Sequence, residues 1–232
     1  MLSKILDKLI QFLRNFISNQ YKLYHKYHNR NQVTNSEIIL NLLKEKKFNP
    51  QHIFDIGCGF GEWTNKSINF FPQSKFYLYD ANKNNIEALS NLKKKNSNIF
   101  YKICLLTDDN ATYDFYNMGY GSSIFEEQTS YKRYVEKMSS ITLYNEITID
   151  IKKYSNNLIK LDVQGSEIKI LKGLKELIHI FEVILIEVSL HNYNKNSPLF
   201  YDVINFMNEN QYKLYDIYDL KRLGENKSFL IQ

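Results

Sequence analysis

The segment from His52 to Trp63 constrains the fold more than any other part of the chain, and it reads HIFDIGCGFGEW. A short apolar run containing one acid leads into three glycines spaced G-x-G-x-G. We predict a buried strand over residues 53–56, a tight turn at the glycines and a helix over 60–70. Glycine permits such a turn and lets the backbone pass close to a ligand, where a Cβ would collide. Strand–glycine–helix turns of this kind hold adenosine-containing cofactors.

The glycine spacing separates two classes of cofactor. The dinucleotide fingerprint is G-x-G-x-x-G, with a pyrophosphate on the helix N-terminus. Here the third glycine comes one residue earlier, and Asp55 precedes Gly57 by two residues. The pattern D-x-G-x-G-x-G is similar to motif I of class I methyltransferases, which bind S-adenosylmethionine (SAM). We therefore predict that Gly57, Gly59 and Gly61 form the cofactor turn and that Asp55 serves the cationic methionine end.

A second acid follows the glycines by about twenty residues, at the end of the predicted strand 75–80. A carboxylate at that place can accept both ribose hydroxyls in a bidentate hydrogen bond. We assign Asp80 and the neighbouring Ala81 to the cofactor ribose. Because NAD carries the same ribose, an NAD-dependent oxidoreductase of Rossmann type is the alternative, and only the glycine spacing argues against it.

Length and composition favour one α/β domain with a short extension in a chain of 232 residues. No apolar run approaches the roughly 20 residues of a membrane span, and the N-terminus lacks a secretory cleavage site. We expect a cytoplasmic protein whose two cysteines are unpaired thiols. The net charge of +5 fits solvated lysine-rich helix faces, although it would also favour an anionic acceptor such as a nucleotide-sugar.

The chain divides into a helical extension over 1–50 and a βα-alternating domain over 51–232. Residues 2–28 read as basic amphipathic helices that could pack on the domain, join two copies as a homodimer or lie on a membrane. An alternation of strands and helices follows, which is typical of an α/β fold. Strands are predicted at 52–56, 75–80, 98–105, 111–116, 140–149, 158–162 and 183–187, and helices at 35–47, 60–70, 83–95, 166–178 and 199–210. A hairpin of 212–217 with 228–231 is predicted to close the sheet.

Four acids fall at the carboxyl ends of predicted strands, where open parallel sheets bind their ligands. They are Asp55, Asp80, Asp162 and Glu187. Carboxylates gathered at one edge repel one another unless cations or hydroxyl donors compensate them. SAM carries a sulfonium and an ammonium, which gives these acids a reason to be there.

Residues 159–167 read IKLDVQGSE and are followed by ILKG at 170–173. This pair of segments resembles the signature of FkbM-type methyltransferases, and residues 186–189 and 212–217 are similar to that family too. The resemblance runs from about His52 to the C-terminus. It implies a Rossmann-like class I methyltransferase fold, with a seven-stranded, mostly parallel sheet whose last strand is antiparallel. It also implies SAM as donor and O-methylation of a sugar, nucleotide-sugar or natural-product hydroxyl, in bacterial glycan or secondary-metabolite biosynthesis.

The chain departs from that family at two places. Asp80-Ala81 stands where family members more often carry Glu-Pro, and Cys58-Gly59 stands where the turn is commonly Ala-Asn. Asp is shorter than Glu, yet its hydroxyl contacts remain feasible, so neither change removes a group that the cofactor needs.

The acceptor chemistry follows partly from a missing motif. Enzymes that methylate base nitrogens typically carry (Asp/Asn)-Pro-Pro-aromatic after this strand, whereas residues 162–165 read DVQG, so we expect no nucleic-acid partner. An alcohol needs a base or a metal to develop alkoxide character. Asp162, Glu187 and His191 could form a base with an orienting acid, or chelate a divalent cation; the metal site stays unassigned. A non-catalytic SAM-fold accessory protein is a further alternative, against which the intact acids Asp55 and Asp80 argue.

Overall fold

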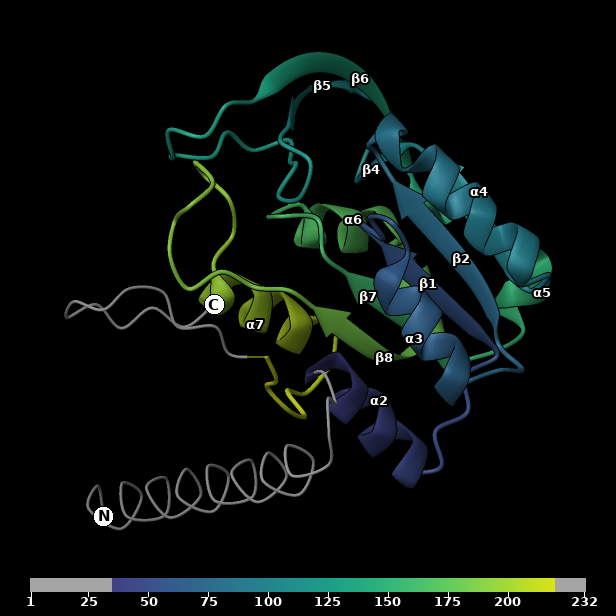
Figure 1. The fold of residues 1–232 in the computed structure, drawn as a ribbon. Helices are drawn as coiled ribbons and strands as arrows, with labels where there is room; N and C mark the ends of the chain where they lie inside the picture. The colour runs from purple at the N-terminus through teal and green to yellow at the C-terminus, as the bar shows by residue number, and fades with distance from the viewer. Residues whose placement is uncertain (1–34, 220–232) are drawn as a thin grey trace, which may run out of the picture.

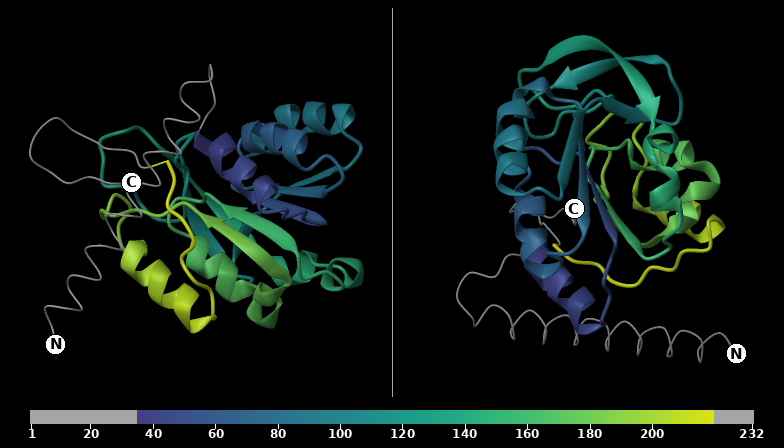
Figure 2. Two further views of the ribbon diagram at one scale, coloured as in Figure 1. Left: turned by 90° about the horizontal axis from the view of Figure 1, so that it is seen from below. Right: turned by 90° about the vertical axis from the view of Figure 1, so that its right-hand side faces the viewer.

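The computed structural model describes residues 35–219, and a parallel sheet sandwiched between two layers of helices forms its centre (Figures 1 and 2). Five strands follow the order β3-β2-β1-β7-β8 and all neighbouring pairs run parallel. They are β1 (His52–Ile56), β2 (Lys75–Asp80), β3 (Ile99–Ile103), β7 (Asn157–Leu161) and β8 (Phe181–Ile186). The chain order reverses between β1 and β7, so the ligand-binding edge is expected where these two strands end.

Each face of the sheet has its own apolar core and its own helices. One core joins the sheet to α2 (Asn35–Glu45), α3 (Glu62–Phe70) and α4 (Ile86–Lys95). The other joins it to α5 (Ile149–Lys152), α6 (Glu167–Gly173) and α7 (Phe200–Glu209). In β1, Ile53 packs into the first core and Phe54 into the second, as the two-residue period of a strand requires.

A smaller sheet covers the carboxyl ends of the central strands (Figure 1). It has the order β4-β6-β5, from β4 (Leu105–Thr107), β5 (Thr112–Asn117) and β6 (Tyr134–Thr142). A single residue, Cys104, separates β3 from β4, and its N–H donates to the Asp80 carbonyl at 2.8 Å. The predicted strand 98–105 is therefore two strands that belong to different sheets.

Two of the strand predictions are wrong. The strand predicted at 140–149 begins earlier, at Tyr134, and gives way to a 3-10 turn at Leu143–Glu146. The start of β6 carries no apolar pattern because this ribbon is exposed and is stabilised by cross-strand pairs such as Lys137 with Asp114, 2.7 Å apart.

The predicted strand 212–217 has no regular structure, so the seven-stranded sheet with an antiparallel last strand is not confirmed. A side chain holds this segment instead: the Tyr212 hydroxyl shares its one hydrogen between the carbonyls of Ile178 and Phe181, which lie 2.7 and 2.6 Å from its oxygen. The other half of the hairpin, 228–231, and the amphipathic region 2–28 lie outside the described residues. Within 35–219, none of the helices has the length and apolar character needed to cross a bilayer.

Candidate functional site

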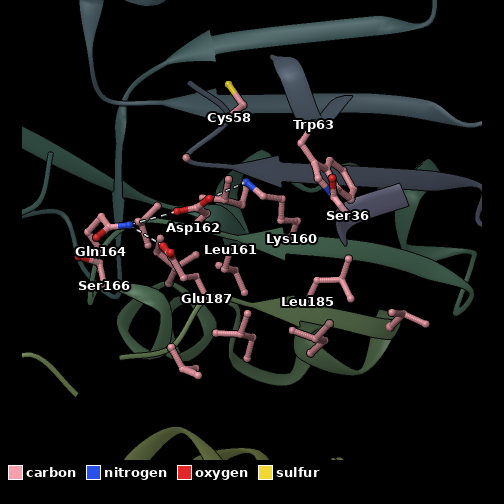
Figure 3. A pocket seen from close by; sticks show the side chains of 18 of the residues that line it. Ser36, Cys58, Trp63, Lys160, Leu161, Asp162, Gln164, Ser166, Leu185 and Glu187 are labelled. Carbon is pink, nitrogen blue, oxygen red and sulfur yellow. Dashed lines mark hydrogen bonds and ion pairs between the residues drawn. The ribbon is translucent and has the colours of Figure 1, made fainter. Parts of the chain in front are cut away.

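A cavity of about 1740 Å³ opens at the carboxyl edge of the central sheet (Figure 3). The glycine turn, the ends of β2, β7 and β8, and the loop 119–124 line it at this edge. It also extends along α2 and residues 46–51, which precede β1, and around β8 towards α7. The volume therefore belongs to a long groove, of which the carboxyl edge of the sheet is one part.

Two glycines of the turn are required for different reasons. Gly57 has φ +70°, and a Cβ there would lie 1.9 Å from the Asp162 carbonyl oxygen. Its backbone must therefore be bare so that the turns after β1 and β7 can touch. Gly59 has φ +56° and nothing within 4 Å of a Cβ position. The backbone of Gly59 is therefore open to contact by a ligand, whereas the backbone of Gly57 is contacted by the Asp162 carbonyl of the protein itself.

Asp80 ends β2 beside this open position and lines the cavity together with Ala81. Its Oδ2 accepts the Gly59 N–H at 2.7 Å, and its Oδ1 accepts the Asn82 N–H at 2.8 Å. Burial raises the pKa of Asp80, and these two backbone hydrogen bonds offset part of that rise. The Asn85 side chain also hydrogen-bonds this carboxylate and lowers its pKa, so a ligand hydroxyl at Asp80 meets oxygens that already accept from protein donors.

Asp55 does not line the cavity, and its side chain is fully buried. Its Oδ2 accepts from the Thr64 hydroxyl at 2.7 Å, and its Oδ1 lies 3.1 Å from Lys160 Nζ. Asp55 and Lys160 are register partners on neighbouring strands β1 and β7. The structure thus surrounds Asp55 with protein groups, and Lys160 is the contacting residue that lines the cavity.

Lys160 joins the buried acid to the cavity, since its Nζ also lies 3.3 Å from Asp162 Oδ2. Burial alone would lower the pKa of Lys160, but the two carboxylates outweigh it and raise the pKa above its ordinary value. Burial would likewise raise the pKa of Asp162, but the Lys160 ammonium and hydrogen bonds with Glu187 and Gln164 together lower it below its ordinary value. Both groups are therefore charged at neutral pH, and Asp162 is a fixed anion facing the cavity.

Gln164 bridges two of the three predicted catalytic residues (Figure 3). Its side-chain amide donates to Asp162 Oδ1 at 3.3 Å and to Glu187 Oε2. His191 is not among the residues that line the cavity, and its ring contacts Tyr193 with centroids 6.3 Å apart. Within 35–219, no trio of His, Cys, Asp or Glu side chains is arranged to hold a metal ion. The structure brings Asp162 and Glu187 together and leaves His191 outside the cavity wall.

Comparison with known proteins identifies the domain. A family model described as the methyltransferase FkbM domain matches residues 47–214. The chain belongs to this family. The FkbM match confirms the predicted Rossmann-like methyltransferase fold and SAM as the cofactor. No curated protein matches the chain.

Two solved structures are distantly similar. A precorrin-6y C5,15-methyltransferase from Geobacter metallireducens GS-15 is 11% identical, with a TM-score of 0.42 and coverage of 88% of this chain and 87% of that chain. A SAM-dependent methyltransferase from Aquifex aeolicus is 13% identical, with a TM-score of 0.40 and coverage of 73% and 76%. At these scores neither structure bears on the assignment, which rests on the FkbM model.

Three side chains of the FkbM domain's cavity were not predicted. Lys160 had a visible signal, a single cation inside the otherwise apolar strand NLIKL. Trp63, the only tryptophan, lines the cavity with its ring 5.8 Å from Lys160 Nζ, and its Nε1 is buried with no hydrogen-bond partner in the described part of the chain. Gln164 had no signal, because its importance comes from a left-handed backbone (φ +56°) that no local pattern predicts.

Proposed function

We propose that this FkbM methyltransferase transfers a methyl group from SAM to a hydroxyl of a sugar, nucleotide-sugar or natural product. The observation that carries the proposal is the pair of carboxylates Asp162 and Glu187, bridged by Gln164 on the cavity wall. The Asp162 anion suits the sulfonium of the donor, and the carboxyl pair can accept a hydrogen bond from an alcohol.

The cofactor is proposed to lie against the glycine turn. Gly59 offers open space where the protein backbone must approach a ligand closely, and the Asp80 carboxylate at the end of β2 is proposed to accept the ribose hydroxyls. Ala81 lines the same wall. Gly57 and Gly61 shape the turn, since a Cβ on Gly61 would lie 2.6 Å from Leu92 Cδ2.

When bound, SAM supplies an electrophilic methyl group on a positively charged sulfur. The residues of the chain must then orient the acceptor hydroxyl and receive its proton. Asp162 is held by Lys160 and Gln164, so it accepts the hydroxyl's hydrogen bond without turning away. We assign proton acceptance to the Asp162–Glu187 pair. His191 stays in the proposal as the third member of the predicted set, and a His191→Ala variant decides its part.

The test is the Asp162→Asn variant, assayed for transfer of radiolabelled methyl from SAM to a panel of nucleotide-sugars. This change keeps the shape and removes the charge, so turnover should fall by at least about 10²-fold. SAM affinity should stay within a few-fold. Asp150→Asn is the matched control, because Asp150 is exposed and forms a surface ion pair with Lys153 at 2.8 Å.

Chelation separates the two chemistries that the carboxylates support. Activity that EDTA abolishes and Mg²⁺ or Mn²⁺ restores means that a metal activates the hydroxyl. Activity that EDTA leaves unchanged means that the carboxylate pair is the base. Full activity of Asp162→Asn on an accepted sugar would overturn the catalytic assignment.

A further inference from the structure

The backbone of Gln164 is held in a conformation that side chains disfavour. Its φ of +56° lies in the left-handed region, which a non-glycine residue keeps only where the surrounding structure enforces it. Two buried side chains enforce it here by donating to the Gln164 carbonyl: Ser123 Oγ and Asn194 Nδ2, each at 2.8 Å. The strain is therefore maintained by two distant segments of the chain.

Those two segments are themselves fixed and joined. Ser123 is 3% exposed, and its backbone exchanges hydrogen bonds of 2.8 and 3.2 Å with Tyr116. Asn194 is 6% exposed and stands opposite Glu127 in an antiparallel bridge. The loops 116–128 and 193–197 thus form one unit, which contacts Gln164 through two hydrogen bonds to a single oxygen.

The next residue prevents this unit from slipping. Gly165 has φ +111°, and a Cβ there would lie 2.7 Å from Ser197 Cβ and 3.2 Å from a carbon of the Phe125 ring. Both loops therefore pack directly on the chain after β7. A displacement of either loop would displace residues 164–165 as well, because close-packed protein interiors deform little.

The opposite end of Gln164 reaches the reacting groups. Its amide nitrogen carries two hydrogens, and the structure directs them to Asp162 and Glu187. Part of the loop, residues 119–124, also lines the cavity. An acceptor that enters the cavity beside this loop would contact a segment that holds Gln164, and Gln164 in turn contacts the carboxylates that would receive the acceptor's proton.

We propose that Gln164 is a positioning residue that couples the loops 116–128 and 193–197 to the Asp162–Glu187 pair. The hydrogen bonds from these loops hold the Gln164 backbone, and the Gln164 amide in turn orients the two carboxylates. The proposal rests on the proposed O-methylation for its kinetic consequence, but the coupling itself exists in the protein without any acceptor.

The first experiment needs no acceptor. In ¹⁵N-labelled protein, the side-chain amide signals of Gln164 are identified by their loss in Gln164→Gly, which keeps the left-handed backbone. Ser123→Ala should move these signals towards those of an exposed glutamine such as Gln73, while Ser130→Ala, at an exposed loop position, should leave them in place. Unchanged Gln164 amide signals in folded Ser123→Ala would overturn the coupling.

The second experiment is a double-mutant cycle on kcat, with the nucleotide-sugar that the panel shows to be accepted. Ser123→Ala removes the hydrogen bond to the Gln164 carbonyl and the one that Ser123 Oγ accepts from Phe125 N–H, and it should lower kcat about 3–10-fold with an unchanged KM for SAM. In the Gln164→Gly background the same change should have less than a twofold effect, because the link is already broken. Ser123→Thr, which keeps the hydroxyl, should restore kcat.

Additive effects of the two substitutions would mean that Ser123 acts independently of Gln164, and the proposal would fail. If no acceptor in the panel is methylated, the proposed function fails, while the amide signals still decide the coupling. The two failures are therefore distinguishable.

Discussion

The two sides of the cavity are built from different kinds of contact. On the proposed cofactor side, backbone groups make the contacts: Gly57 N donates to the Tyr79 carbonyl at 2.8 Å, and Gly59 N donates to the Asp80 side chain. On the proposed acceptor side, the side chains of Ser123 and Asn194 donate to one carbonyl, that of Gln164, which lies 41 and 30 residues away from them in the sequence. A site made by the backbone leaves a spacing of glycines and strand ends in the sequence, whereas a site made by loop side chains leaves none.

The largest effect on stability is expected from adding a methyl group to Gly57, in the glycine turn. Gly57→Ala combines a left-handed φ of +70° with a contact of 1.9 Å to the Asp162 carbonyl oxygen. Strain and overpacking together should lower the free energy of unfolding by about 4 kcal/mol or prevent folding altogether. Urea unfolding followed by circular dichroism measures the loss.

The matched control is Gly119→Ala on the acceptor side. Gly119 has a similar φ, +75°, but a Cβ there would meet nothing within 4 Å. Only the backbone cost of about 1–2 kcal/mol should remain. If both variants lose the same stability, the contact between the turns after β1 and β7 is not what requires the glycine.

The turn between the two sides contains a buried acid whose ionisation should destabilise the fold. Glu167 is 4% exposed, and its oxygens accept the N–H groups of Val163 and Gly165 at 2.9–3.2 Å. Burial raises the pKa of Glu167 from 4.5 to about 7. Between these values the folded state binds more protons than the unfolded state, so stability falls as the pH rises.

The expected loss between pH 4.5 and 7 is on the order of 2–3 kcal/mol, relative to the Glu167→Gln variant, which does not titrate. Urea unfolding of both proteins at pH 4.5 and pH 7.5 gives the difference directly. A wild-type protein that gains stability over this range relative to Glu167→Gln would show that the backbone N–H groups fully stabilise the charged form.

The sequence pattern predicted the location of those elements whose residues repeat with the period of a strand or a helix. The central strands, the glycine turn, Asp80 at the end of β2 and Asp162 just after β7 lie where the sequence predicts them. It failed at β6, whose polar residues are paired across an exposed ribbon, and at 212–217, which Tyr212 anchors through its hydroxyl. The prediction that Asp55 binds the cofactor directly missed its ion pair with Lys160. A contact between residues on neighbouring strands can be predicted only when the register of the two strands is known.

A smaller effect is expected at the cofactor ribose. If Asp80 accepts its hydroxyls, Asp80→Ala should weaken SAM binding by about 1.5–3 kcal/mol, the value of hydrogen bonds to a charged group. Titration calorimetry measures the affinity, and circular dichroism shows whether the variant keeps its fold without the bonds from Gly59 and Asn82. An unchanged SAM affinity in a folded Asp80→Ala protein would remove Asp80 from the cofactor site.

The smallest effect on the fold is expected at Tyr120, on the acceptor side. Tyr120 is 72% exposed, and its ring meets that of Phe60 edge-on with centroids 5.7 Å apart. Tyr120→Ala should change the free energy of unfolding by less than about 0.5 kcal/mol, as exposed positions usually do. It should also leave SAM affinity within about twofold, because Asp80 and Gly59 are untouched.

The Tyr120→Ala substitution should instead change the KM for the acceptor. Loss of one aromatic contact is worth about 0.5–1.5 kcal/mol, so the KM for an accepted nucleotide-sugar should rise about 2- to 13-fold. Tyr120→Phe keeps the ring and should behave as the wild type, which separates the ring from the hydroxyl that interacts with Glu62. If Tyr120→Ala instead lowers SAM affinity and leaves the KM for the acceptor unchanged, the loop 119–124 belongs to the cofactor side. The proposed separation of the cavity into a cofactor side and an acceptor side would then be wrong.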